Sequence, residues 1–202
     1  HLLVCHSVVR FHARAAGTPL PLLQMNSWLP RLRLILLLWS QLPVLWGHEF
    51  RFGPCRVEGV ALPGLWEAFR TVKDAVQVQD NNTSIRLLRC EVLQNVSDSE
   101  SCHLVHDLLK FYLNTVFKHY YPKIAESNTQ PSFSTLANNF VFIVSKLQSS
   151  QAGEMPPDKD RARRRFLLFK RAFKQLEIQA ALTKAFGEVD ILLTWMGKFY
   201  QL

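Results

Sequence analysis

Two histidines of this sequence have a spacing that could hold a metal ion. His103 and His106 are three residues apart, which would place both imidazoles on one face of a helix and could begin a zinc site. No HExxH or CxxC motif accompanies them, and a zinc site needs three or four ligands. We therefore predict that both are solvated helix histidines and that the chain binds no metal.

Catalytic groups are equally sparse. A Cys–His pair through Cys90 is conceivable, but no further residue in the sequence supports it. Neither the GxGxxG motif of dinucleotide sites nor the GxxxxGK[ST] motif of phosphate-binding loops occurs. We predict that the protein is not an enzyme and carries no cofactor.

Basic residues crowd one predicted helix, and such a cluster could bind an acidic polymer. They are Arg161, Arg163, Arg164, Arg165, Lys170, Arg171 and Lys174. The opposite face of this helix carries Phe166, Phe169 and Phe173, so a solvated face is the simpler interpretation. A contact with heparan sulfate or with an acidic receptor is the alternative. Leu167 lies among the charges and is expected to be exposed, which points mildly to a protein partner.

Residues 25–47 resemble a secretory signal peptide. Met25 begins the segment, Arg31 and Arg33 supply positive charge, and the apolar run 34–39 follows. This run is shorter than the roughly 20 apolar residues of a membrane span, so we expect no membrane insertion.

The expected division of the chain has three parts. Residues 1–24 are a leader outside the mature protein, 25–47 the signal peptide, and 48–202 a single secreted domain. The whole chain has 24 basic and 16 acidic side chains, a net charge of +8. Four arginines and no acid precede residue 48, which leaves 20 against 16, or +4. That excess is too small for a dedicated nucleic-acid-binding protein.

The stretch 97–121 is predicted to be the central helix. Ser97 and Glu100 have the spacing of a capping box. Apolar residues three and four positions apart cover about two-thirds of the helix circumference, which is typical of a helix with others packed around it. A narrow polar strip runs from His103 to Lys118, and Pro122 is expected to end the helix.

Apolar residues recur at helical spacing in most of the remaining chain. Helices are expected over 65–76, 85–93, 133–147, 158–176 and 178–199. Whether the last two are continuous stays open, because 177–181 contains no strong helix breaker. Residues 49–64 are expected to be extended, and no alternating strand pattern of useful length occurs. Together with 48% hydrophobic residues and only 8 glycines, this predicts an all-α bundle of five or six helices in a single domain.

Modification sites fit a secreted protein. Asn81, Asn82 and Asn95 each begin an N-x-Ser/Thr triplet, so we expect N-glycans on Asn95 and on one of the two adjacent asparagines. Three cysteines follow the signal peptide, at positions 55, 90 and 102, which suggests one disulfide and one leftover thiol. A small, secreted, helical glycoprotein without an active site is typical of a helical cytokine.

A family resemblance rests on the central helix. Ser97, Cys102 and the runs 108–109, 111–113 and 115–117 follow the spacing of the interleukin-10 family signature. The carboxyl-terminal run KAFGEVDILLTWMGKF is similar to the last helix of that family. The resemblance covers residues 48–202, with His103 in a place where the signature prefers another residue.

This resemblance implies a monomeric six-helix cytokine with a disulfide between Cys55 and Cys102. It implies that the protein binds two class II cytokine receptor chains, the interleukin-20 receptor beta chain with either the interleukin-20 receptor alpha or the interleukin-22 receptor alpha-1 chain. Signalling would then pass through Janus kinases to STAT transcription factors, in immune response and epithelial tissue homeostasis.

The resemblance also implies where the receptor chains bind. One chain should meet the first and central helices, and the other should meet the loop after the first helix together with the last helix. The exposed polar candidates for these contacts are Arg70, Lys73, Lys110, Asn114, Lys184, Glu188 and Lys198.

A small secreted carrier with a ligand pocket between its helices is the alternative function. An unfilled internal cavity would favour the carrier, and a filled core would favour the cytokine. An enzyme is the third possibility, which a convergent set of perturbed titratable groups in one cleft would support.

Overall fold

The computed structural model of the chain describes residues 48–76, 85–150 and 156–201. The predicted leader and signal peptide lie outside this part, as do Asn81 and Asn82. Within it, no helix is long and apolar enough to cross a membrane.

The central helix consists of three consecutive segments. They are α4 (Asp98–Phe111), the π-helical η1 (Tyr112–Phe117) and α5 (Lys118–Ile124). The predicted capping box is confirmed, because the Glu100 N–H donates to Ser97 Oγ and the Ser97 N–H donates to Glu100 Oε2. The prediction that Pro122 ends the helix is wrong. Pro122 lies inside α5, where it removes only one backbone N–H donor, and the helix continues to Ile124.

Six other α-helices and the short 3-10 helix η3 (Gly197–Phe199) lie in the described part of the chain. The α-helices are α2 (Leu62–Val76), α3 (Cys90–Leu93), α6 (Gln130–Ser150), α7 (Pro156–Lys174), α8 (Ile178–Gly187) and α9 (Val189–Met196). Glu177 separates α7 from α8, since its carboxylate accepts the N–H groups of Gln179 and Ala180 and so caps a new helix. The predicted apolar row of the last segment is buried except at its two ends: Ile178 is 59% exposed, and Phe199 is partly buried.

Residues 49–58 are extended, as predicted, but α2 already begins at Leu62, and the extended residues form a sheet that the sequence did not predict. The strands β1 (Glu49–Phe52) and β2 (Cys55–Glu58) form an antiparallel hairpin, and β3 (Tyr200–Gln201) pairs with the other edge of β1. In β1 and β2 the apolar residues alternate with polar ones and are fully buried. Each strand has four residues or fewer, too short for the alternation to be recognised in the sequence.

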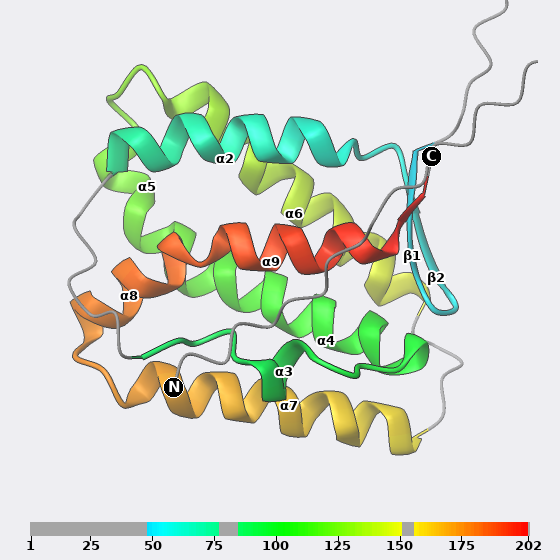
Figure 1. Cartoon of the computed structure of the whole chain (residues 1–202). Coiled ribbons are helices and arrows are strands. Elements are labelled where there is room, and N and C mark those ends of the chain that lie inside the picture. Colours follow the sequence, from blue (N-terminus) through cyan, green and yellow to red (C-terminus); the bar gives the residue numbers. More distant parts are fainter. Residues whose placement is uncertain (1–47, 77–84, 151–155, 202) are drawn as a thin grey trace, which may run out of the picture. The chain divides into compact units, whose positions relative to one another are not determined.

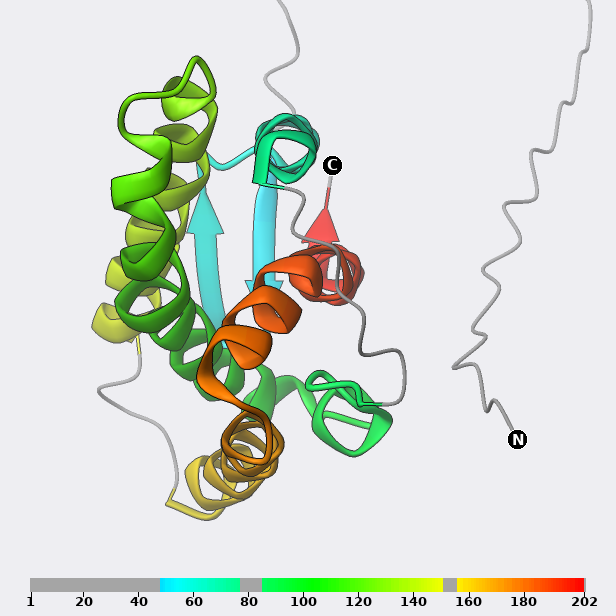
Figure 2. The same cartoon turned by 90° about the vertical axis from the view of Figure 1, so that its left-hand side faces the viewer.

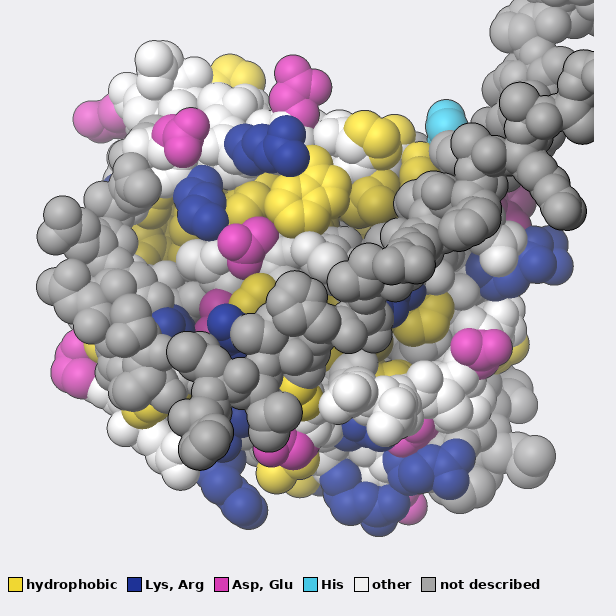
Figure 3. Space-filling view, in the orientation of Figure 1, with side chains coloured by type: hydrophobic (Ala, Val, Ile, Leu, Met, Phe, Trp, Pro, Cys, Tyr) yellow, Lys and Arg dark blue, Asp and Glu magenta, His cyan; other side chains and the backbone are white. Residues whose placement is uncertain are grey.

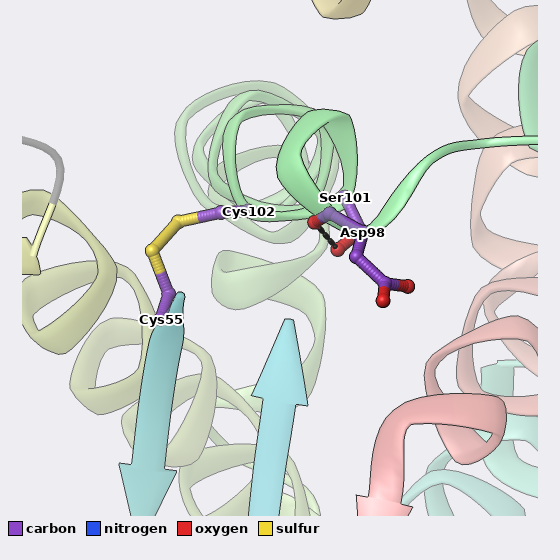
Figure 4. Close-up of a disulfide and its surroundings, with 4 residues drawn as sticks. All are labelled: Cys55, Asp98, Ser101 and Cys102. Carbon is purple, nitrogen blue, oxygen red and sulfur yellow. Dashed lines mark hydrogen bonds between the residues drawn. A yellow bond between two sulfur atoms is a disulfide. The ribbon is translucent and has the colours of Figure 1, made fainter. Parts of the chain in front are cut away.

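Gly53 fixes the hairpin against the central helix. Its φ of +58° suits glycine, and a Cβ atom there would lie 2.3 Å from the carbonyl oxygen of Asp98. This close approach brings Cys55, at the start of β2, to Cys102 in α4 (Figure 4). The two cysteines form a disulfide with their Cα atoms 6.0 Å apart, the pairing that the resemblance implies. Cys90 is also disulfide-bonded, so the leftover thiol expected from the cysteine count is not found among the described residues.

Two helices of the bundle each pack against two others. The central α4 packs against α6 and α7, whereas α2 packs against α6 and α9. In both views α2 and α7 lie on opposite sides of the helical domain, with α4 and α9 between them (Figures 1 and 2).

Aromatic rings fill the space between these helices. The ring of Phe117 lies 5.3 Å from those of Phe133 and Phe140 and 6.3 Å from that of Phe186. Phe111 similarly contacts Phe169 of α7 at 5.1 Å. The described core therefore holds side chains where a carrier would hold a ligand, as expected of a cytokine.

Candidate functional site

The structure separates His103 and His106 by their surroundings. His103 is only 6% exposed, so the prediction that it is solvated is wrong. Helix α4 packs against β1, α6 and α7. Nδ1 of His106 lies 3.0 Å from Oδ1 of Asp107. Among the described residues no group of three or more side chains could hold a metal ion.

The predicted receptor-contact residues differ in exposure. Arg70, Lys110, Asn114 and Lys198 are exposed, and the Lys73 side chain is 40% exposed. These five side chains are therefore accessible to a partner protein.

Lys184 and Glu188 do not point outward, so the prediction is wrong for both. They are 8% and 6% exposed. The apolar spacing of the last helices leaves this side polar, but the irregular segment before α3 crosses it and binds the carboxylate of Glu188. Sequence periodicity cannot reveal such a cover, because the covering segment lies 100 residues away in the chain.

Glu188 fastens that segment to the junction of α8 and α9. Its Oε2 accepts a hydrogen bond of 2.7 Å from the Leu88 N–H, and its Oε1 accepts one of 3.0 Å from the Leu87 N–H. Burial raises the pKa of Glu188. The two N–H donors and the charges of Lys184 and Arg86 oppose the shift without cancelling it. The carboxylate therefore has a structural role.

Tyr112 faces the same junction from the central helix. Burial, together with the negative charges of Glu188 and Asp190, raises the pKa of its hydroxyl well above the ordinary value. Within the described residues this hydroxyl has no hydrogen-bond partner. The side of the central helix that carries Tyr112 is thus the side that faces the α8–α9 junction.

Lys73 and Lys110 consequently lie on opposite sides of the domain. Nζ of Lys73 is 3.1 Å from Oδ2 of Asp190, which ties α2 to α9. Lys110 precedes Tyr112 by two residues, a rotation of about 200° around the helix, so it points away from the α8–α9 junction. The structure therefore does not bring the predicted residues of the first and central helices onto one face. Asp190 was missed, because a single acid in an apolar helix gives no sign of its distant partner.

A second ionic cluster connects α7 to the start of α4. The Glu100 side chain is 4% exposed, and its Oε1 lies 3.4 Å from Nε of Arg161 and 3.5 Å from Nε of Arg165. Burial alone would raise the pKa of Glu100, but hydrogen bonds from Ser97 and the two guanidinium groups outweigh burial and lower this pKa.

Arg165 also holds the loop that carries a predicted glycosylation site. Its guanidinium donates to the carbonyl oxygens of Glu91 at 2.9 Å, Gln94 at 3.0 Å and Asn95 at 3.0 Å. Asn95 is exposed and has a φ of +51°, a backbone conformation that asparagine adopts more readily than most residues.

The perturbed titratable groups do not make an active site. Glu100 and Glu177 act as helix caps, and Glu188 is bound to backbone N–H groups. None of these carboxylates is paired with a nucleophile in the described structure. What the surface offers is exposed polar side chains on several helices, an arrangement suited to binding proteins.

No family model matches the sequence. Individual proteins do: interleukin-24 of Rattus norvegicus is 66% identical over 174 residues, which cover 86% of this chain and 95% of that protein. Interleukin-24 of Homo sapiens is also 66% identical, over 86% of this chain and 84% of its own length. Interleukin-20 of Mus musculus is 33% identical over 79% of this chain and 89% of that protein. The chain belongs to the interleukin-10 family. It is a helical cytokine and not an enzyme.

Solved structures of the interleukin-10 family confirm the predicted all-α bundle. An edited human interleukin-24 is 62% identical and superposes with a TM-score of 0.65, covering 76% of this chain and 99% of that one. Human interleukin-19 is 28% identical with a TM-score of 0.54, covering 68% and 87% respectively.

Proposed function

We propose that this chain is a secreted, monomeric cytokine that brings two class II cytokine receptor chains together. The identity of 66% with interleukin-24 over most of the chain carries this proposal. The receptor pair is the interleukin-20 receptor beta chain with either the interleukin-20 receptor alpha or the interleukin-22 receptor alpha-1 chain. Assembly would activate Janus kinases and STAT transcription factors.

The exposed polar residues support two separate receptor faces. One face lies on α2, where Arg70 stacks 5.7 Å above the Trp66 ring and Lys73 pairs with Asp190 of α9. The other lies on the outer side of the central helix, with Lys110 and Asn114. A cytokine that must hold two receptor chains at once needs two such surfaces.

The proposed mature protein is the domain 48–202, released after a signal peptide at 25–47 and a leader at 1–24. The described residues of this domain include the disulfide between Cys55 and Cys102, which suits an oxidising, extracellular compartment.

The proposal is tested by STAT phosphorylation in cells that express defined receptor pairs. The purified mature domain should activate STAT only when both chains of one of the two named pairs are present. Cells with single receptor chains are the control, because one chain alone cannot form the signalling complex. A protein that activates STAT through neither pair would not be the cytokine proposed here.

A further inference from the structure

Helix α7 presents cations that the fold does not use. Arg163, Arg164, Arg171 and Lys174 are exposed, and none of them forms an ion pair, hydrogen bond or ring contact with another described residue. Lys and Arg side chains accordingly gather along the lower edge of the molecule, where α7 lies (Figure 3).

Three other basic residues of α7 already have structural partners. Arg165 and Arg161 bind Glu100, and Nζ of Lys170 lies 5.8 Å from the centre of the Phe166 ring. Some basic side chains of α7 therefore contact other residues of the protein, whereas the others face solvent. A helix whose basic residues served only solubility would have no need to place several of the same sign together.

The solvent-facing cations form an elongated row. From Arg163 to Lys174 the helix rises about 16 Å at 1.5 Å per residue. No acidic residue occurs between positions 161 and 176, so no charge within the helix interrupts the row. A straight row of unpaired cations matches a linear polyanion better than a single anionic group.

We propose that these four residues of α7 bind a linear sulfated polysaccharide of the heparan sulfate type. Guanidinium groups form paired hydrogen bonds with the planar edges of oxyanions, and a sulfate offers the same oxygen geometry as a phosphate. Each contact releases counterions, so binding weakens steeply as salt rises.

An anionic bilayer fits this helix less well. A helix that lies on a membrane inserts its apolar face, but the apolar face of α7 is packed into the core, with Phe169 fully buried and Phe173 7% exposed. Only Leu167 and Leu168 remain on the outer side, 49% and 42% exposed. The exposure of Leu167 agrees with the sequence prediction.

Binding at α7 leaves a receptor face accessible. Helix α2 lies on the opposite side of the domain from α7 (Figures 1 and 2). A cytokine held on a polysaccharide through α7 can therefore still present Arg70 and Lys73 to a receptor chain. This last step rests on the proposed receptor function, whereas the polysaccharide site itself does not.

The test is the affinity of the mature domain for heparin at about 0.15 M salt. The triple variant Arg164→Gln, Arg171→Gln and Lys174→Gln should bind at least about tenfold more weakly and depend less on salt. A matched variant, Arg56→Gln, Lys118→Gln and Lys198→Gln, removes three exposed cations elsewhere and should stay within about twofold of the wild type. Thermal unfolding should be unchanged in both variants, because all six substituted side chains are exposed and those on α7 form no ion pair or hydrogen bond with another described residue.

If both triple variants lost the same heparin affinity, net charge alone would explain the loss, and the α7 site would be overturned. The α7 site would also be overturned if the wild-type protein bound vesicles of anionic lipid but not heparin. The α7 triple variant, added to cells in solution, should still activate STAT. A failure of the polysaccharide site is therefore distinguishable from a failure of the receptor proposal.

Discussion

The carboxylate of Glu188 accepts a hydrogen bond of 2.7 Å from the backbone N–H of Leu88, which lies 100 residues earlier in the chain. The contact fixes an irregular segment across the α8–α9 junction, where Glu188 is only 6% exposed. A buried carboxylate with this role makes the stability of the domain depend on pH.

Glu188→Gln should change that pH dependence. Burial raises the folded-state pKa of Glu188 above its unfolded value of about 4.3. Between these two pKa values the folded protein binds more protons, so the contribution of this carboxyl to the unfolding free energy decreases as pH rises. Glutamine does not titrate, and the stability of the variant relative to the wild type should therefore increase with pH. Urea unfolding at several pH values measures this difference.

Glu188→Ala is the matched control for the hydrogen bonds. It leaves the N–H groups of Leu87 and Leu88 without an acceptor and should be about 3 kcal/mol less stable than Glu188→Gln. This difference should be the same at every pH, because neither alanine nor glutamine titrates. A Glu188→Gln variant whose difference from the wild type does not vary with pH would contradict the assignment of a raised pKa.

Arg165→Ala should destabilise the domain by about 2–4 kcal/mol, because it removes the donor to three carbonyl oxygens and one partner of the buried Glu100. Arg164→Ala, one position earlier on the exposed side of α7, should change the unfolding free energy by less than about 0.5 kcal/mol. Denaturant unfolding of the two variants compares them directly. Similar losses in both would show that Arg165 does not hold the loop.

Local features of the fold were predictable from the sequence, whereas contacts between distant segments were not. The capping box of Ser97 and Glu100 lies within four residues, and the amphipathic helices are visible in their apolar spacing. The burial of Glu188 and the pairing of Lys73 with Asp190 depend on segments 100 or more residues apart. For this reason the sequence correctly predicted the bundle and the exposed Lys110, yet placed Glu188 on the surface.

The disulfide between Cys55 and Cys102 should be recovered by peptide mapping of the secreted protein without reduction. The cysteines are 47 residues apart, and closing a loop of that size stabilises a fold by about 4 kcal/mol in the chain-entropy model. Replacing both with serine should lower the unfolding free energy by about that amount. A mapped bridge between Cys90 and either residue would contradict the pairing.

Asn95 should carry an N-glycan, because it is exposed and begins a sequon in the loop before α4. Asn95→Asp should remove one glycan mass from the secreted protein, as should Ser97→Ala. Only Ser97→Ala also removes the helix cap and should cost about 1 kcal/mol of stability. Ser97→Thr keeps both sequon and cap and is the control. Glycosidase treatment should reveal at most one further glycan, on Asn81 or Asn82, since glycans on adjacent residues would collide.

Lys73→Glu and Lys110→Glu should weaken different receptor chains, because the two side chains lie on opposite sides of the domain. Each reversal should weaken one isolated receptor ectodomain about tenfold, more than the matching alanine change, since single charges at the rim of an interface contribute little. Binding of each variant to each ectodomain by surface plasmon resonance measures the effect.

The double variant Lys73→Glu with Asp190→Lys separates the receptor contact from the fold. It restores an ion pair between α2 and α9 in the opposite orientation, and the half-exposed pair contributes about 1 kcal/mol or less to stability. If the receptor chain recognises the charge of Lys73, the double variant should bind as weakly as Lys73→Glu alone. Recovery of wild-type affinity would mean that Lys73 acts only through Asp190. If Lys73→Glu and Lys110→Glu instead weakened the same receptor chain, the assignment of two separate faces would be wrong.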